Sequence, residues 1–293
     1  MLDFRIDTFL TVCKYMNFTK AADELCITQP AVSQHIKYLE NSYNTKFFEY
    51  EGKKIKLTQS GKIFYQTMSM MKHDEQYLKE QIIQEKSGIR KLRFGATRTI
   101  GEFILPPKLS DYLNKNNNIN MTMLVGNTEY LLNKLENGEI DFALVEGYFT
   151  KNKYDFVVYS REKFVAISSK DYQFKKQPRV LEDLLQETLI LREKGSGTRD
   201  IFEKNLETQN LTINDFSKVI EIGNINAIKS LVKNNNGITA LYEIAVKDEL
   251  ENGTLKKVDI KDLQKSHDFY FIWRKNSSFK NLYQKLAEDL KIC

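Results

Sequence analysis

Cysteine is scarce in this chain of 293 residues, which contains only Cys13, Cys26 and Cys293. Three cysteines at these spacings are too few and too scattered for a disulfide framework or a zinc site. Cys13 and Cys26 fall where small apolar side chains would pack a helical core. We therefore interpret both as packing residues rather than redox sensors.

Histidine is equally rare, and His35, His73 and His267 stand far apart. None of them neighbours a nucleophile or a carboxylate motif, and neither Gly-x-Ser-x-Gly nor a metal-ligand spacing occurs. The sequence therefore predicts that the protein is not an enzyme and has no catalytic residues, metal site or cofactor.

Long apolar runs are also missing, since none approaches the roughly 18 residues that a membrane span needs. The first residues lack the basic and then apolar pattern of an export signal. We therefore expect a cytoplasmic protein without membrane contact.

Charge of one sign is not in large excess: the net charge is +5, and residues 1–60 hold eight Lys and Arg against seven Asp and Glu. Any attraction to nucleic acid must come from local placement of charge.

Two short helical patterns joined by a polar turn occupy residues 18–40. Thr19 is the expected N-cap of the first, and Pro30 the first residue of the second. One face of the second helix is an apolar stripe formed by Val32, Ile36 and Leu39. The opposite face suits the major groove of DNA, because it is small, polar and singly basic: Pro30, Ser33, Gln34 and Lys37. An ordinary helical hairpin with a solvated face fits the same pattern.

Further matches make this stretch resemble the DNA-binding segment of LysR-type transcriptional regulators. The matches extend in register over more than forty positions: Phe18-Thr19, Ala21-Ala22, Leu25, Gln29 to Ser33, Leu39-Glu40, Phe47-Phe48, Lys53-Lys54, Leu57-Thr58 and Gly61. Tyr50 departs from the family, which usually has arginine at this position. The phosphate contact expected of that arginine is therefore missing here or is made by Lys53 or Lys54 instead. The resemblance implies DNA contacts by Thr19, Gln29, Pro30, Ser33, Gln34, Lys37, Lys53 and Lys54.

A long helical pattern runs from Thr58 to about Lys86. Its apolar residues follow spacings of four and three, which suits pairing with another helix, and Glu75 interrupts them: Phe64, Met68, Met71, Leu78 and Ile82. A helix packed on its own domain is the alternative. The resemblance favours a winged helix-turn-helix at 1–58, with a hairpin from Lys46 to Thr58, and a dimerisation linker helix at 59–88.

Alternating strands and helices after Gly88 predict an α/β domain over residues 89–293. Strand patterns are expected at 91–97, 120–125, 141–145, 188–192, 219–222, 237–241, 255–260 and 268–274. Residues 155–169 read as two strand-like runs, at a crossing between lobes. The resemblance implies a two-lobed fold of the periplasmic-binding-protein type, with lobe I at about 89–162 and 265–293 and lobe II at about 163–264.

Three junctions between a strand and the next helix are candidate ligand sites, because ligands bind beyond the carboxyl ends of such strands. The sharpest is Gly195 to Arg199, whose glycines, hydroxyls and arginine predict an anion cradle. A dinucleotide site is disfavoured because Asp200 replaces the last glycine of that motif, while a plain glycine-rich turn remains the alternative. The expected effector residues are Thr97, Arg98, Thr99, Asn127, Thr128, Ser196, Gly197, Thr198, Arg199 and Asn224.

The run from Leu191 to Arg199, which includes Gly-Ser-Gly-Thr-Arg, looks like a subset of the family that responds to small anionic metabolites, notably in sulfur assimilation and carbon fixation. The predicted function is a sequence-specific DNA-binding regulator controlled by a small anionic effector. Its implied partners are double-stranded DNA, a second chain paired through the linker helix, a homotetramer and RNA polymerase. A ligand-independent regulator, a solute-binding protein and an enzyme on the same α/β fold are the alternatives.

Overall fold

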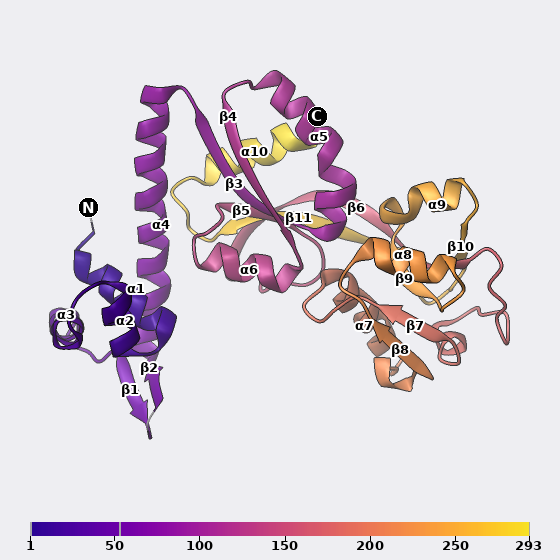
Figure 1. The fold of residues 1–293 in the computed structure, drawn as a ribbon, viewed down its shortest axis with the longest axis horizontal. Helices are drawn as coiled ribbons and strands as arrows, with labels where there is room; N and C mark the ends of the chain where they lie inside the picture. Colours follow the sequence, from indigo (N-terminus) through magenta and orange to yellow (C-terminus); the bar gives the residue numbers. More distant parts are fainter. Residues whose placement is uncertain (1, 53, 293) are drawn as a thin grey trace. The chain divides into compact units, whose positions relative to one another are not determined.

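A computed structural model describes residues 2–52 and 54–292, which form two compact units with the boundary at Gly88 (Figure 1). The first unit consists of α1 (Phe4–Tyr15), α2 (Phe18–Glu24), α3 (Gln29–Ser42), β1 (Phe48–Glu51), β2 (Lys54–Leu57) and α4 (Gln59–Ser87). Across the described residues, no helix has the length and apolar character to cross a membrane.

The apolar stripes of α1, α2 and α3 meet in one core of the first unit. Val32, Ile36 and Leu39 of α3 are buried there, as the helical spacing predicted. Aromatic rings close the core: the rings of Phe47 and Phe64 stack with their centroids 4.3 Å apart, and Phe9 contacts both edge-on. The core therefore fixes α3 with its polar face outward.

Two helix boundaries and the exposure of one cysteine correct sequence expectations in this unit. Asn17, rather than Thr19, caps α2, because its extended backbone lets its side chain accept a hydrogen bond from the Lys20 amide. Thr28 caps α3, so that Pro30 takes the second helical position instead of the first. Cys26 is exposed, and its predicted packing role is wrong. Cys13 does pack against the core, and burial raises the pKa of its thiol to about 12.

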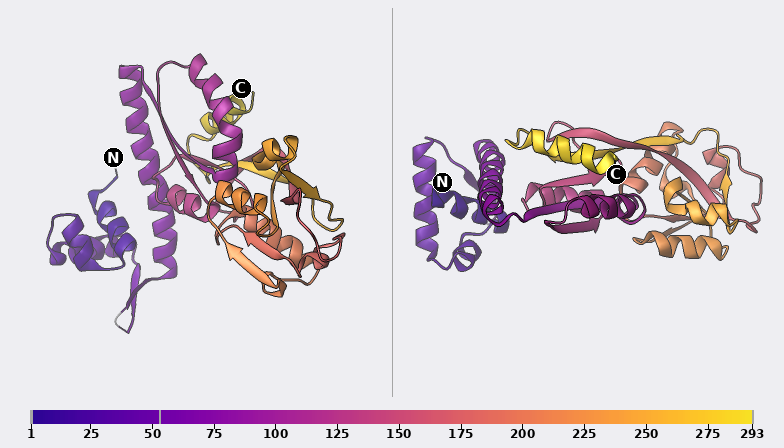
Figure 2. Two further views of the ribbon diagram at one scale, coloured as in Figure 1. Left: turned by 45° about the vertical axis from the view of Figure 1, so that its right-hand side comes forward. Right: turned by 90° about the horizontal axis from the view of Figure 1, so that it is seen from above.

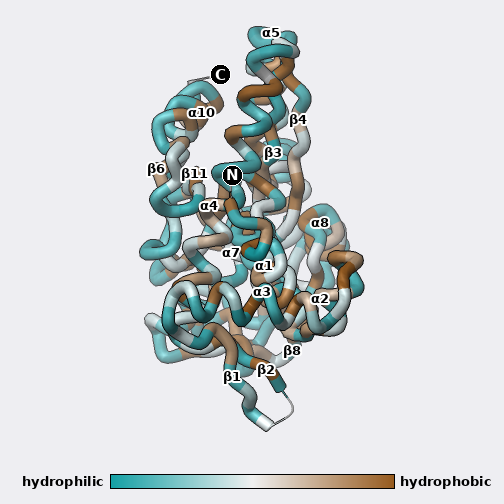
Figure 3. Tube along the Cα trace, turned by 90° about the vertical axis from the view of Figure 1, so that its left-hand side faces the viewer, coloured by the Kyte–Doolittle hydropathy of each residue, from teal (hydrophilic) through white to brown (hydrophobic). Residues whose placement is uncertain are grey.

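A two-stranded antiparallel hairpin follows α3, with Phe48 opposite Leu57 and Glu51 opposite Lys54. On β1, Phe48 is buried while Glu49, Tyr50 and Glu51, which lie nearer the tip, are exposed, and Figure 3 shows this strand brown at its start and paler or teal toward the tip. Thr58 then caps α4 by accepting a hydrogen bond from the Gly61 amide. These elements form a winged helix-turn-helix.

The apolar residues of α4 divide into two groups, which corrects the expected seam. Phe64 and Met68 are buried in the core of the first unit, so they are not available to a second chain. Met71, Leu78 and Ile82 are each about half exposed, at 48%, 50% and 48%. Periodicity identified all five as apolar, but the nearby core of the first unit takes the first two.

The second unit is built on a curled mixed sheet of strand order β10-β6-β11-β5-β3-β4, with β9 beside β6. Parallel pairing joins β3 to β4 and β5, and antiparallel pairing joins β11 to β5 and β6. The strands are β3 (Arg90–Thr97), β4 (Ile119–Gly126), β5 (Phe142–Val145), β6 (Tyr154–Ser169), β9 (Thr239–Tyr242), β10 (Leu255–Val258) and β11 (Ser266–Arg274).

β6 is one continuous strand, and the expectation of two separate runs at 155–169 is wrong. Its first part pairs with β11 and its last part with β9 and β10. The strand therefore carries the chain from the region of β3, β4 and β5 to that of β9 and β10, and β11 leads back. β6 does not have to end at the crossing, because its hydrogen-bonding partner changes from β11 to β9 and β10 along one uninterrupted strand.

Helices cover both faces of the sheet around β3, β4 and β5, and side chains alternate between the faces. Phe142 and Leu144 share one core with α5 (Leu105–Lys115) and α10 (Lys280–Ile292). Ala143 and Val145 lie in another core with α6 (Thr128–Glu136). All four residues of β5 are thus buried, as expected of a central strand between two helical layers (Figure 2).

The rest of this unit is built around β7 (Thr188–Leu191) and β8 (Lys218–Glu221), which pair in parallel. α8 (Ile225–Lys233) packs against β6, β7 and β9 through Ile225, Ile228 and Val232. α7 (Gly197–Thr208) follows β7, and α9 (Lys247–Glu251) precedes β10. A single π-helical turn, η1 (Ile100–Ile104), follows β3 and leads into α5.

Candidate DNA-binding surface and effector site

The outward face of α3 is the first candidate site. Gln29, Pro30, Gln34 and Lys37 are exposed, and Ser33 is half-buried while its hydroxyl accepts a hydrogen bond from the Gln29 amide at 2.9 Å. Thr19 on α2 and Lys54 on β2 are also exposed, whereas Lys53 lies outside the described residues. Tyr50 is 73% exposed on β1, so its ring is free of the core.

Polar contacts behind this face hold α3 in place. His35 Nδ1 lies 2.9 Å from the Thr8 hydroxyl of α1. Glu40 is buried at the other end of α3, where its carboxylate accepts hydrogen bonds from the Phe47 amide and the Lys46 ammonium at 2.9 and 2.7 Å. α3 is therefore tied to α1 at one turn and to the start of the hairpin at another, which suits a helix that must present its polar face rigidly.

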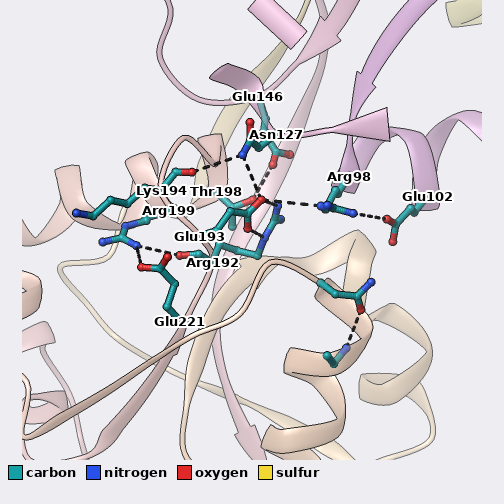
Figure 4. Close-up of polar contacts among 12 residues, drawn as sticks. Arg98, Glu102, Asn127, Glu146, Arg192, Glu193, Lys194, Thr198, Arg199 and Glu221 are labelled. Atoms are coloured by element: carbon teal, nitrogen blue, oxygen red, sulfur yellow. Dashed lines mark hydrogen bonds and ion pairs between the residues drawn. The ribbon is translucent and has the colours of Figure 1, made fainter. Parts of the chain in front are cut away.

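The second candidate lies where β3, β5 and β7 end and η1, α6 and α7 begin, and we call it the strand-end site (Figure 4). It comprises Thr97, Arg98, Thr99, Asn127, Thr128, Glu146, Arg192, Glu193, Ser196, Gly197 and Thr198. Most of these side chains are buried, among them Thr97, Thr99, Ser196 and Thr198 at 1% exposure each. Helix N-termini at carboxyl ends of strands are the usual place for a ligand in such folds.

Glu146 connects β5 to both facing helices. Its main-chain oxygen accepts a hydrogen bond from the Thr128 hydroxyl of α6 at 2.9 Å. Its side-chain Oε1 accepts one from the Thr198 hydroxyl of α7 at 2.6 Å. Although the sequence led us to expect Thr198 as a ligand donor, its hydroxyl is occupied by Glu146 in this structure.

Glycine at 147 and 197 is required by a close approach of the backbone. A Cβ on Gly197 would lie 2.2 Å from the Glu146 carbonyl oxygen, and one on Gly147 would lie 2.4 Å from the Gly197 Cα. Neither neighbour can give way without moving the main chain. The end of β5 and the start of α7 therefore touch because both positions lack a side chain.

The charged residues of the strand-end site form a chain of ion pairs. Arg192 holds Glu193 through Nε and Nη2, at 2.8 and 3.1 Å. Arg98 lies 3.9 Å from both Glu193 and Glu102, and the Asn127 amide donates to Glu193 at 3.4 Å. Burial favours a higher pKa for Glu193, but the bonds and charge of Arg192, aided by Arg98, lower it overall.

The side chains of two expected effector residues, Arg199 and Asn224, already form hydrogen bonds within the protein. Arg199 donates to Glu203 and Glu221 at 2.7 and 2.6 Å, and also to the Arg192 carbonyl oxygen. Asn224 is exposed and caps α8 by accepting a hydrogen bond from the Ala227 amide. Arg192, which was not among the expected residues, is buried, and its charge lowers the pKa of Glu146, whereas its Nη1 has no hydrogen-bond partner among the described residues.

Several polar atoms of the strand-end site are buried without a hydrogen-bond partner among the described residues. They are Thr97 Oγ1, Arg98 Nε, Glu146 Oε2, Arg192 Nη1 and Ser196 Oγ. Buried polar groups in native proteins are nearly always paired, and an unpaired one costs about 1–3 kcal/mol. All five atoms belong to residues of the strand-end site, so a bound polar ligand could supply the partners that they lack.

Three residues of the strand-end site were not expected from the sequence: Glu146, Arg192 and Glu193. Glu146 and Arg192 follow directly after a buried strand, β5 and β7 respectively, so an ionisable residue at the end of an apolar strand was the available signal. The described residues contain no group of three or more His, Cys, Asp or Glu placed to hold a metal ion.

The geometry defines a DNA-binding regulator: a winged helix-turn-helix followed by an α/β ligand-binding unit. Family comparison agrees, since residues 5–62 match the bacterial regulatory helix-turn-helix protein, lysR family, and residues 86–291 match the LysR substrate binding domain. The chain belongs to the LysR family of transcriptional regulators. Its relatives are regulators and not enzymes, as the sequence predicted.

An uncharacterized HTH-type transcriptional regulator of Methanocaldococcus jannaschii is 31% identical over 269 residues, which cover 90% of each chain. Full-length LysG from Corynebacterium glutamicum, with bound effector Arg, has a similar fold at a TM-score of 0.68 and 16% identity, covering 100% of this chain and 98% of that one. The regulatory domain of Synechocystis CcmR, in complex with 2-phosphoglycolate, gives a TM-score of 0.61 at 22% identity over 69% of this chain and 96% of that one.

Proposed function

We propose that the strand-end site binds a small anionic effector and that this binding controls how the helix-turn-helix occupies DNA. The observation that carries the proposal is the set of buried atoms without partners among the residues of the strand-end site, of which Thr97 Oγ1, Ser196 Oγ and Arg192 Nη1 are all able to donate. Amides at the starts of α6 and α7 add dipoles of the sign that favours an anion. The CcmR domain with 2-phosphoglycolate offers one precedent on this fold, while the arginine of LysG shows that other effectors occur.

The proposed effector site keeps the expected residues, adds Arg192 and divides their roles. Thr97, Ser196 and the backbone at Gly197 contact the ligand, with Arg98 and Arg192 as the cations. Thr99, Asn127, Thr128 and Thr198 hold the walls of the site, and Arg199 and Asn224 fix the ends of α7 and α8. We assign lobe I to about 89–162 and 265–293 and lobe II to about 163–264, so that a ligand here would bias their relative angle.

At the DNA, we propose that Gln34 and Gln29 read base edges while Lys37 and Lys54 contact phosphates. Pro30, Ser33 and Thr19 would lie against the backbone or the groove wall, and Lys53 joins the phosphate contacts because it precedes Lys54 in the sequence. The exposed polar face of α3, backed by its buried stripe, supports this assignment.

We further propose that two chains pair through α4, and that regulatory domains associate into tetramers. Met71, Leu78 and Ile82 leave an apolar strip on this helix, which a second chain would cover. RNA polymerase is a further partner of such a regulator at a promoter. Because its target is chromosomal DNA, we place the protein in the cytoplasm.

Calorimetric titration of the whole chain with sulfate, thiosulfate and 2-phosphoglycolate, and with arginine as a cationic comparison, tests the effector proposal. We expect at least one anion to bind, and Ser196→Ala to weaken that binding roughly ten- to hundredfold, because it removes a hydrogen bond to a charged group.

Ser168→Ala is the matched control, since Ser168 is a buried serine of β6 whose hydroxyl bonds the Ser169 carbonyl outside the strand-end site. It should leave the affinity unchanged. Binding of arginine with no response to any anion, or equal anion binding by Ser196→Ala, would contradict the proposal.

A further inference from the structure

Glu146 is a carboxyl group in a site whose other unpartnered side chains are able to donate hydrogen bonds. It is 1% exposed, its Oε1 accepts from the Thr198 hydroxyl, and its Oε2 has no partner within the described part of the chain. An ionised carboxylate here would repel an anionic effector. A neutral carboxylic acid would instead offer an O–H donor, so the protonation of Glu146 decides what the site is able to bind.

The charges around Glu146 leave it without a compensating cation. Arg192 is engaged by Glu193 through two of its nitrogens, and Arg98 lies between Glu193 and Glu102 (Figure 4). No ion pair within 4.0 Å joins Glu146 to any Lys or Arg that the structure describes. A buried charge without a partner is costly, and the cheaper state is the protonated one.

Groups on the neighbouring elements shift the pKa of the Glu146 carboxyl. Burial raises the pKa of Glu146; the Thr198 hydroxyl, the charge of Arg192 and the nearby Thr99 lower it, and the charge of Glu193 raises it further, with a net upward direction. From β9, the buried phenol of Tyr242 is near enough for the Glu146 charge to raise its own pKa. The balance therefore favours a neutral carboxyl, with the proton available to Oε2 because Oε1 already accepts.

We propose that Glu146 binds the effector as a neutral acid, its Oε2–H donating to an oxygen of the anion, so that the anion and one proton are held together. This rests on the proposed anion-binding function of the strand-end site. The proton comes from solvent where Glu146 is ionised in the free protein, and it stays on Oε2 with no bond broken in the ligand. The site then presents five donors: Thr97 Oγ1, Arg98 Nε, Ser196 Oγ, Arg192 Nη1 and Glu146 Oε2.

The proposal names a ligand class: a small, fully ionised oxyanion whose contacting oxygens are all acceptors. A ligand that directs an ammonium group toward Glu146 would meet the acid proton, and is selected against. Glu146 is thus a specificity-determining residue as well as a proton carrier.

The test is calorimetric titration of the whole chain with sulfate and thiosulfate, which do not take up protons near neutral pH, from about pH 6 to about pH 9. Two buffers of different ionisation enthalpy at each pH report the protons taken up with the anion. We expect the affinity to fall with rising pH, approaching tenfold per pH unit on the alkaline side, with an uptake that approaches one proton per anion there.

Glu146→Gln identifies the residue, because the amide keeps the size of the side chain and its NH2 donates at every pH. We expect this variant to bind sulfate with nearly the low-pH affinity of the native chain across the whole range, without proton uptake. Glu187→Gln is the matched control: Glu187 is also buried but bonds Tyr172 away from the site, so this variant should keep the native pH dependence.

The outcomes separate the two proposals. If neither anion binds at pH 6, and 2-phosphoglycolate does not bind either, the proposed function fails and this inference with it. Anion binding with no proton uptake and no pH dependence in the native chain overturns the inference alone. So does proton uptake that persists in Glu146→Gln, since the proton would then belong to another group. The measurement on the native chain decides the matter even where the variant does not fold.

Discussion

Gln34 carries the most specific role assigned to a single residue of the DNA-binding surface. It is exposed on α3, one turn beyond the helix start, where side chains reach base edges in the major groove. Gln34→Ala should cost about 1–3 kcal/mol on the best site selected from a random DNA library, and should relax the preference at one base position. Fluorescence anisotropy with that site and its single-base variants is the measurement.

Lys54→Ala provides the contrast, because a phosphate contact carries no sequence information. This change should weaken binding to all DNA alike and lower the slope of the salt dependence by about one. Should Gln34→Ala behave in this uniform way, or leave affinity and preference untouched, the recognition face has been assigned to the wrong residues.

Asp200, in the first turn of α7, predicts a dependence of stability on pH. Burial, with Glu203 and Glu129 nearby, raises its pKa to about 6, against the opposing charge of Arg199. Because the folded chain holds this proton more tightly than the unfolded chain, the contribution of Asp200 is most favourable below about pH 4 and is lost as pH rises through about 6.

Asp200→Asn removes this titration, so it should raise the melting temperature relative to the native chain at about pH 7.5, and do so less at about pH 5. Thermal unfolding without effector, at matched ionic strength, measures both values. A difference between the two chains that is constant over this range would show that Asp200 does not titrate as described.

α4 is the element on which assembly depends in our proposal. A double change, Met71→Asp with Leu78→Asp, places two charges on the half-exposed apolar strip, and burying them in an interface would be costly. We expect association of the two chains to weaken by roughly a hundredfold or more. Sedimentation velocity over a range of concentrations measures this.

Lys62→Asp changes the charge of the same helix at an exposed polar position, and it should leave the association intact. Circular dichroism, and the thermal stability of each variant measured without DNA, serve as folding checks. An unchanged oligomer in the double variant would place the interface on another surface.

For the whole molecule, the prediction is a reciprocal coupling between effector and DNA. Coupling of this kind typically amounts to about 1–3 kcal/mol, a change of roughly 5- to 150-fold in affinity. The affinity for the operator with and without saturating anion, and for the anion with and without operator, should change by the same factor. Ser196→Ala should require a higher anion concentration for saturation, and its operator affinity should then change by a similar factor. If the anion did not change the affinity for the operator, and the operator did not change the affinity for the anion, the anion would have no regulatory role.

Local pattern in the sequence determined the elements and the class of protein. The stripe of Val32, Ile36 and Leu39 required a helix with one buried face, and the alternation of apolar strands with helices after Gly88 required an α/β unit. These features depend on spacings of two to four residues, which can be read from the sequence without knowledge of the tertiary structure. For the same reason the start of α2 was misplaced by two residues and that of α3 by one, since Asn17, Thr19 and Thr28 all have side chains that cap.

Only the tertiary structure decided which partner each feature meets. Phe64 and Met68 have the same spacing as Met71 and Leu78, but the aromatic core of the first unit takes the former and leaves the latter exposed. Glu146 and Thr198 are far apart in sequence, yet they bond because β5 and β7 end at the same place and glycines at 147 and 197 let the backbones touch. Arg199 looked like the cation of the cradle, whereas Glu203 and Glu221 hold it, and Arg192 is the arginine whose charge acts on Glu146. Periodicity records that a side chain is apolar or charged, and the packing of distant segments determines what that side chain contacts.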